Sequence, residues 1–224
     1  RDNYRDLLFN NENNTYSIKF SELSYNVNNE CANIIPGQEN LTLVKSRIVK
    51  NPVHISKVID SGGKKIAYLM YNQFLGLVES ENKDYNSELN DVFSNFLSNG
   101  AEELVIDLRY NPGGRISTSI NLASMITGQF NNQVFAKERW NSKLMNYWNE
   151  NSPESLLNKF TNKLENNQSI ASLNLNRVFI LTSARTASAS ELLINGLDPY
   201  IDVIHIGDFT VGKNQGSITV YDYI

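Results

Sequence analysis

The chain has few of the residues that build disulfides and metal centres. Of its 224 residues one is cysteine, Cys31, and two are histidines, His54 and His205. A single cysteine excludes an intrachain disulfide and a zinc site made of paired thiolates. The two histidines stand far apart in the sequence without a carboxylate pattern beside them. The sequence therefore predicts no metal site.

Clusters of positive charge and long apolar runs are missing as well. The 20 lysines and arginines are outnumbered by 24 acidic residues, which gives a net charge of −4. Without a Lys/Arg patch that could neutralise a run of phosphates, we expect no nucleic-acid partner. No segment approaches the roughly 20 apolar residues of a membrane-spanning helix. Because Arg1 is no initiator methionine and a strand pattern stops at Ile224 without a turn, we expect a chain trimmed at both ends.

The character of the sequence changes at about residue 50. Hydrophobic residues make up 41% of the chain, enough for a sizeable core. Residues 1–50 are polar and rich in asparagine, with short strand-like runs at 17–20 and 41–44, and we interpret them as a small β-rich segment. Residues 51–224 alternate strand and helix patterns. This alternation predicts an α/β domain with a mostly parallel sheet.

Most elements of this domain have clear patterns. Strands are predicted at 65–74, 103–109, 177–183 and 201–207, and helices at 87–99, 116–127 and 188–197. The first helix should bury Leu89, Val92, Phe93, Phe96 and Leu97, and Gly100 and Gly128 stand where the first two helices should end. The run 103–109 is apolar enough for a strand buried on both faces. Residues 129–176 are less legible, and we expect an excursion from the sheet with a helix that begins at Ser152–Glu154 and carries Leu156, Leu157, Phe160 and Leu164.

The first candidate for chemistry is the run DLRYNPGG, residues 107–114, where a strand ends. Pro112 restricts Asn111, and the glycines let the backbone turn sharply and come close to a ligand. Such a loop can present peptide N–H groups that stabilise an oxyanion. The competing interpretation is a simple strand-to-helix turn. Asp107 and Arg109 share a face of the strand and are expected to support the loop through an ion pair.

The second candidate is Ser188 in the run TASASELL, at the start of a predicted helix. The N–H of Ala189 and the positive end of the helix dipole would face negative charge that develops beside the Ser188 hydroxyl. Ser188 and Glu191 also match the S-x-x-E capping box, which simply starts helices. Taken alone, the pattern favours capping.

A lysine 25 positions further on changes the balance. If strands 177–183 and 201–207 are neighbours, the following loop emerges on the Ser188 side, and Lys213 can reach the hydroxyl. A lysine in water has a pKa of about 10.4, but burial, here by Phe209 and Val211, would make it a base. A solvated loop lysine is the alternative. His205 is the other possible base, although its place inside a strand predicts a core histidine.

Together NPGG, TASASE and the GK of Lys213 resemble the tail-specific, or C-terminal processing, serine peptidases of the S41 type. Within this family, the motifs are similar to the variant form found in exported proteins of Bacteroidetes-type bacteria. The resemblance covers residue 50 to the end and implies a crotonase- or ClpP-like α/β core. It also implies a protein or peptide substrate, cleaved usually near an apolar C-terminus, and no cofactor. Carried over, it makes Ser188 the nucleophile, Lys213 the general base, and the N–H groups of Ala189 and of Gly113 or Gly114 the oxyanion hole.

Two departures from the family pattern concern the lysine and the N-terminus. Many members have a glutamine four residues after the lysine, where this chain has Ser217, with Gln215 two residues after. In an extended segment both share a face with Lys213, so either could orient its amine, and Glu191 is a further candidate. Residues 1–50 are too short for the usual PDZ domain and could be its last strands. The family is mostly exported, which implies a periplasmic or lipoprotein location.

Three functions follow from these patterns. The first is a Ser–Lys endopeptidase that works through an acyl-enzyme. The second is a non-catalytic relative that binds peptides by strand addition beside the site. The third is an esterase or other hydrolase that uses His205 as its base.

Overall fold

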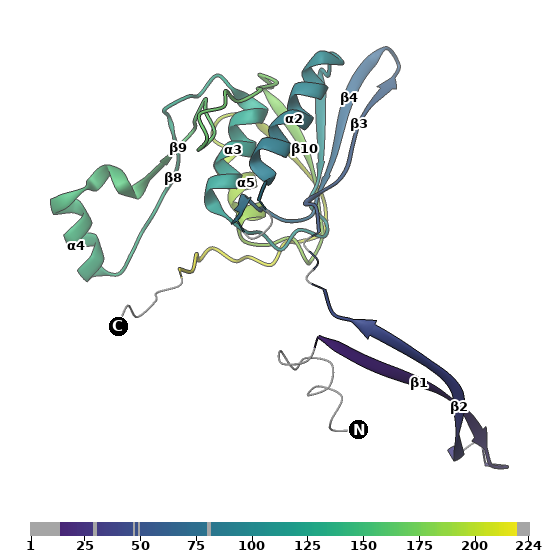
Figure 1. Ribbon diagram of the computed structural model, residues 1–224. Coiled ribbons are helices and arrows are strands. Elements are labelled where there is room, and N and C mark those ends of the chain that lie inside the picture. Colours follow the sequence, from purple (N-terminus) through teal and green to yellow (C-terminus); the bar gives the residue numbers. More distant parts are fainter. Residues whose placement is uncertain (1–13, 29–30, 47, 49, 80–81, 219–224) are drawn as a thin grey trace. The chain divides into compact units, whose positions relative to one another are not determined.

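The computed structural model describes residues 14–28, 31–46, 48, 50–79 and 82–218 (Figure 1). The chain divides into two compact units, Arg1–Lys50 and Asn51–Ile224. Each unit is described separately. No helix in the described ranges is long and apolar enough to cross a membrane.

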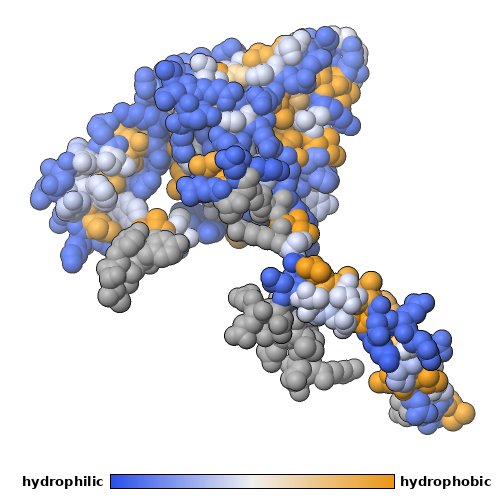
Figure 2. Space-filling view, in the orientation of Figure 1, coloured by the Kyte–Doolittle hydropathy of each residue, from blue (hydrophilic) through white to orange (hydrophobic). Residues whose placement is uncertain are grey.

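The first unit is an antiparallel pair of strands, β1 (Thr15–Tyr25) and β2 (Cys31–Val44). Both predicted strand runs fall within these strands, so the expectation of a β-rich segment is confirmed. Many of its apolar side chains are exposed, among them Phe20 and Leu23, and Figure 2 shows hydrophobic residues along its surface. A lone two-stranded ribbon is marginally stable at best in water, and it offers no core of its own.

The second unit is built on a five-stranded sheet in the order β11-β10-β7-β4-β3. Its strands are β3 (Val53–Ser61), β4 (Lys64–Tyr71), β7 (Glu103–Asp107), β10 (Arg177–Thr182) and β11 (Asp202–Gly207). All neighbours are parallel except the edge pair β3 and β4. The predicted mostly parallel sheet is confirmed, and so is the placement of β10 beside β11.

Helices α2 (Tyr85–Ser98), α3 (Ile116–Thr127) and α5 (Ala189–Leu197) pack together on the sheet (Figure 1). Alternate residues of the central strands, such as Leu104 and Ile106, are fully buried, whereas Val105 between them is only half-buried. The strand that was expected to be buried on both faces is thus fully buried on one face and partly buried on the other.

Helix α2 begins where the side chain of Asp84 accepts a hydrogen bond from the Asn86 N–H at 3.0 Å. It buries Leu89, Phe93 and Phe96, at the spacing of one helix face. Leu97 was expected on this face but is 43% exposed. It lies about 100° around the helix from Phe96, at the edge of the buried stripe.

Residues 134–159 form an arm outside the main sheet (Figure 1). It consists of β8 (Val134–Lys137), α4 (Ser142–Asn151), a 3-10 turn (Pro153–Leu156) and β9 (Leu157–Lys159), and β8 pairs with β9. The expected helix begins at Ser152 as predicted, but it is only the 3-10 turn Pro153–Leu156, so its predicted continuation through Leu164 is wrong. The α-helix lies earlier, where the side chain of Asn141 accepts from the Leu144 N–H at 3.0 Å, and Leu157 continues as a strand.

Two short strands, β5 (Leu77–Val78) and β6 (Lys83–Asp84), complete the described elements. Helix α3 occupies the predicted bounds and ends at Gly128, whose φ is 69°. The carboxyl ends of β7 and β10 thus each lead through a short loop into a helix. At such an edge of a parallel sheet, ligands bind.

Candidate active site

The loops that follow β7 and β10 are hydrogen-bonded to each other. The Thr186 hydroxyl donates to the Leu108 carbonyl at 2.8 Å. The Ala187 N–H and the Ser190 hydroxyl both donate to the Asn111 carbonyl, at 3.2 and 3.1 Å. The NPGG and TASASE runs, 70 or more residues apart in sequence, therefore form one structural unit.

Asn111 holds the turn of the NPGG loop. Its side chain is fully buried, donates to the Tyr71 carbonyl at 2.9 Å and accepts from the Gly113 N–H at 2.8 Å. The sequence reasoning missed this role, and those of Thr186 and Ser190. The available signal was three small polar side chains directly after buried strands, where backbone groups need partners.

Both glycines of the loop are required by their surroundings. Gly113 has a φ of 101° and Gly114 a φ of 147°, a region that side chains rarely adopt. A Cβ on Gly113 would lie 2.7 Å from the Cβ of Ser188 and 2.9 Å from the nitrogen of Ala189. A Cβ on Gly114 would lie 2.2 Å from the carbonyl oxygen of Phe74. The loop consequently lies directly against Ser188.

Only some of the expected oxyanion donors are available. The Gly113 N–H is engaged by Asn111, so the role of Gly113 is close approach. Phe74 donates to the Gly113 carbonyl at 2.9 Å and accepts from the Arg115 N–H at 2.8 Å, which turns the N–H of Gly114 away from Phe74. In the described part of the chain no hydrogen bond is recorded for the N–H of Gly114 or of Ala189.

Ser188 has a backbone conformation that helix capping does not need. Its φ is 58° and its ψ is −115°, whereas Asp84 and Asn141, which cap α2 and α4 with their side chains, are extended. Such a conformation costs about 1–3 kcal/mol and is found mainly where a site requires it. The predicted capping box is present: the Ser188 side chain accepts from the Glu191 N–H, and the Glu191 carboxylate accepts from the Ser188 N–H at 2.7 Å. It does not account for the strain at Ser188.

Glu191 joins the serine to the lysine segment. The Glu191 oxygen that binds Ser188 also accepts from the Lys213 N–H at 2.9 Å, and the other oxygen accepts from the Gly212 N–H. Burial tends to raise the pKa of Glu191, but the Thr210 hydroxyl and the three backbone N–H groups together lower it below its usual value. Glu191 is thus a buried carboxylate that fixes the backbone of Lys213 beside Ser188.

The lysine itself is exposed. Phe209 and Val211 were expected to bury Lys213, but they are 88% and 57% exposed, so this expectation is wrong. The reason is that residues 208–218 leave the sheet as an extended segment without secondary structure. Among the described residues no hydrogen bond joins Lys213 to Ser188, Gln215 or Ser217 through its amine.

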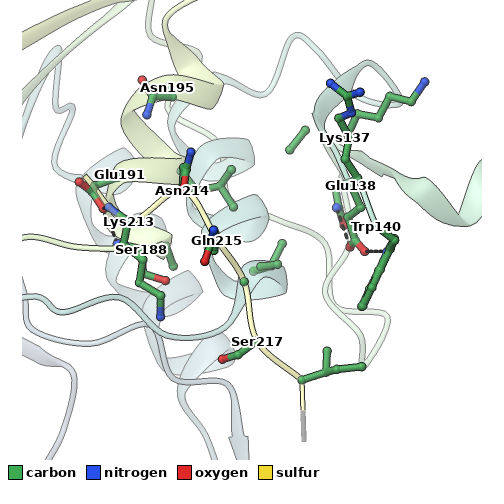
Figure 3. Close-up of a pocket in the computed structure, with 18 of the residues that line it drawn as sticks. Lys137, Glu138, Trp140, Ser188, Glu191, Asn195, Lys213, Asn214, Gln215 and Ser217 are labelled. Atoms are coloured by element: carbon green, nitrogen blue, oxygen red, sulfur yellow. Dashed lines mark hydrogen bonds between the residues drawn. The ribbon is translucent and has the colours of Figure 1, made fainter. Parts of the chain in front are cut away.

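Ser188 and Lys213 line one pocket of about 650 Å³ (Figure 3). This volume is in the range of small-molecule and peptide-side-chain sites, about 300–1,000 Å³. One wall is the start of α5 with Ser188, Ala189 and Glu191, and a second is the segment 212–218, which includes Gln215 and Ser217. The third wall is the arm, through residues 136–140 and Asn158.

The expected ion pair below the NPGG loop is present. Arg109 binds the carboxylate of Asp107 with its Nη2 at 2.7 Å, and the Tyr68 hydroxyl donates to the same carboxylate at 2.8 Å. Burial raises the pKa of Asp107, yet the hydrogen bonds from Arg109 and Tyr68 outweigh it and hold this pKa below its usual value. The loop therefore begins at a fixed carboxylate.

The histidines lie apart from this pocket. His205 is exposed on β11, with its Nε2 at the Thr182 hydroxyl, so the expected core histidine is wrong. His54 is exposed on β3. The described ranges contain no group of three or more His, Cys, Asp or Glu that could hold a metal ion.

Comparisons with known proteins agree with this geometry. The sequence model of peptidase family S41 matches residues 65–220. A crystal structure of a putative S41 protease from Bacteroides fragilis is 32% identical, with a TM-score of 0.63, over 89% of this chain and 49% of that one. The photosystem II D1 C-terminal processing protease shares the fold, with a TM-score of 0.51 and 18% identity over 78% of this chain and 41% of that one.

A carboxyl-terminal-processing protease from Picosynechococcus is 29% identical over 83 residues, which are 37% of this chain and 18% of that protein. The chain thus spans about half the length of the Bacteroides structure and less of the curated relative. The family match covers most of the second unit, including the NPGG loop, Ser188 and Lys213. The chain belongs to peptidase family S41.

Proposed function

We propose that this chain carries the active site of a serine endopeptidase, with Ser188 as nucleophile and Lys213 as general base. The observation that carries the proposal is the state of Ser188. It is held at a φ of 58° against Gly113, and within the described chain no hydrogen bond uses the N–H groups of its neighbours Gly114 and Ala189. A nucleophile beside two free donors is the arrangement that acyl transfer requires.

In the proposed reaction, Lys213 accepts the Ser188 proton while the serine oxygen attacks the peptide carbonyl. The N–H groups of Gly114 and Ala189 stabilise the oxyanion of the tetrahedral intermediate. Lys213 then gives its proton to the leaving amine, and water, deprotonated by the same amine, hydrolyses the acyl-enzyme. Lys213 is exposed at the wall of the pocket, and a peptide bound there displaces water from its amine.

The test is cleavage of an unfolded protein and of a peptide with an apolar C-terminus, followed by mass spectrometry of the products. Ser188→Ala and Lys213→Ala should each lower kcat/KM by at least about 10³-fold. Ser98→Ala, on the exposed end of α2, and Lys163→Ala, an exposed lysine, are the matched controls and should retain wild-type rates. Cleavage unchanged by both active-site substitutions would refute the proposal.

The residue that orients the Lys213 amine is proposed to be Gln215 or Ser217. Both line the pocket with Lys213, and Glu191 already fixes the lysine backbone. Gln215→Ala and Ser217→Ala should separate them, since only loss of the orienting group should lower kcat while KM stays constant. Equal, near wild-type kcat for both variants would leave Glu191 as the group that positions the lysine.

A second candidate is a peptide-binding relative without catalysis. It is favoured by the exposure of Lys213 and by the absence, among the described residues, of a hydrogen bond between its amine and Ser188. In that case the wild-type protein and Ser188→Ala would bind the test peptide equally, and neither would cleave it. An esterase that uses His205 is disfavoured, because His205 does not line the pocket.

Three further parts of the proposal rest on the family alone. We propose cleavage near apolar C-termini, an exported location in the periplasm or as a lipoprotein, and an origin of β1 and β2 in a PDZ-like domain. Fractionation of the producing cells would test the location. Peptides that end in a free carboxylate or in an amide, compared in cleavage rate, would test the preference for C-termini.

A further inference from the structure

The arm contributes a fixed aromatic side chain to the pocket. Trp140 stands on the arm wall, opposite the segment that carries Lys213 (Figure 3). Its indole N–H donates to Glu138 at 3.1 Å, and the other oxygen of Glu138 accepts from the Asn158 side chain at 3.1 Å. Figure 3 shows the indole nearly edge-on, with one face toward the hollow of the pocket.

These two hydrogen bonds hold the indole before any ligand arrives. Glu138 and Trp140 are half-buried, and Asn158 belongs to β9, so the contact joins the two strands of the arm at the pocket. Ordering a free side chain on binding costs conformational entropy, and a side chain that is already fixed avoids most of this cost. An aromatic ring with a fixed face is suited to contact another apolar group.

The remaining groups around the pocket favour an apolar guest. Both carboxylate oxygens of Glu138 and of Glu191 already accept hydrogen bonds from the protein, and these bonds compete with those of a basic side chain. Lys137 and Arg139 stand on the arm at the same wall and are exposed, so they would repel one. The other apolar side chains of the pocket include Ile116, Leu192 and Ile218.

We propose that Trp140 determines the specificity of this site: its indole face binds an apolar side chain of the peptide substrate, and Glu138 is its positioning residue. This inference rests on the proposed peptidase function only in taking this pocket as the place where the substrate binds. The contact itself is a binding event, so it is tested separately from catalysis. The same arm supplies the control, because the second tryptophan, Trp148, packs on Tyr147 and does not line the pocket.

The first experiment measures cleavage with peptides that carry a single leucine at each of the four positions on either side of the cleaved bond, with alanine elsewhere. The wild-type protein should prefer leucine at one position by about tenfold, the effect of one good apolar contact. Trp140→Ala should reduce this preference to less than about threefold, because kcat/KM falls more for the leucine peptide than for the all-alanine peptide. Trp148→Phe should keep the preference. An equal preference in Trp140→Ala and the wild-type protein would overturn the proposal.

The second experiment measures binding without turnover. In the double variant Ser188→Ala, Trp148→Phe, Trp140 is the only tryptophan, and titration with the preferred leucine peptide should shift or quench its emission. The all-alanine peptide should need about tenfold higher concentration for the same change. A fluorescein-labelled peptide that binds by anisotropy while Trp140 emission stays constant would refute the contact. Absence of binding by both signals would refute it as well.

A third measurement concerns Glu138. Glu138→Gln keeps the size of the side chain but replaces one of the two charged acceptor oxygens by an N–H₂ group. The hydrogen bonds that hold the indole are weakened, so the indole should become more mobile. In the Trp148→Phe background, we expect a lower fluorescence anisotropy of Trp140, and in the cleavage assay a higher KM with kcat unchanged. If wild-type protein cleaves nothing, the peptidase function fails, and the emission titration still decides whether Trp140 binds the peptide.

Discussion

Replacement of Glu191 by glutamine tests whether the serine and lysine segments are held together as the structure indicates. In the folded protein the carboxylate of Glu191 accepts from the N–H groups of Ser188, Gly212 and Lys213. An amide keeps one neutral acceptor oxygen and places an N–H₂ group against the remaining donors. Because a hydrogen bond to a charged group contributes about 1.5–3 kcal/mol, Glu191→Gln should lower the free energy of unfolding by about 2–3 kcal/mol.

The pH dependence gives this prediction its sign. The folded-state pKa of Glu191 lies below the ordinary value of 4.5, so the carboxylate stabilises the fold above pH 4.5. This contribution is lost as the pH falls through the folded-state pKa. The difference in unfolding free energy between wild-type and Glu191→Gln should therefore be constant from about pH 5 upward. It should become smaller below pH 4.5.

The assay is urea unfolding followed by circular dichroism at several pH values, together with kcat under folding conditions. Glu154→Gln is the control, because Glu154 is an exposed partner of Lys159 at 2.7 Å, and such a pair contributes less than about 1 kcal/mol. We also expect kcat of Glu191→Gln to fall by at least about tenfold while the protein is fully folded, since the Lys213 backbone loses its anchor. A variant within about 0.5 kcal/mol of wild-type and with unchanged kcat would refute the reasoning.

Three further outcomes are expected from the loops around Ser188. Gly113→Ala should lower kcat by at least about 100-fold, because its Cβ would displace Ser188, whereas Gly62→Ala, also at positive φ but with nothing within 4 Å, should cost only about 1 kcal/mol of stability and no activity. Asp107→Asn should lower the free energy of unfolding, measured in urea, by about 1–3 kcal/mol, because the buried carboxylate loses its charged hydrogen bond with Arg109. The loss is limited because Arg109 is half exposed and regains water. Thr186→Val should cost about 1–2 kcal/mol, measured in the same way, because the Leu108 carbonyl loses its buried donor.

The parts of the fold that the sequence predicts are those in which local pattern and burial agree. The strand and helix around Ser188, and the strand after it, follow from continuous apolar runs and one-sided apolar spacing, and the structure has them at nearly the same residues. The arm was expected as an excursion from the sheet, but its strands were missed because they are only four and three residues long and pair with each other. Segments this short show no recognisable alternation of apolar and polar residues in the sequence. They are strands only because they pair with each other.

The site was predictable in its residue types and not in its environment. A serine, a lysine and a pair of glycines have recognisable spacing, but the burial of Lys213 depends on what packs over an extended segment. The sequence reasoning assigned that burial to Phe209 and Val211, which point into solvent. Likewise Asn111 stabilises the loop through hydrogen bonds with Tyr71 and Ala187, each of which lies 40 or more positions away in the sequence. Tertiary partners of this kind leave no trace in local pattern.

The capping box and the proposed nucleophile are two aspects of one structure. A capping box requires the Glu191 carboxylate at the start of α5, where it accepts from the N–H of Ser188. This single bond leaves the carboxylate able to accept from further donors. The same carboxylate also accepts from the N–H groups of Gly212 and Lys213, so the residue that starts the helix also holds the Lys213 backbone. An ordinary helix start would leave Ser188 extended, as Asp84 and Asn141 are. The positive φ of Ser188 is therefore the feature that distinguishes this helix start from those of α2 and α4, and it occurs where Ser188 packs against Gly113.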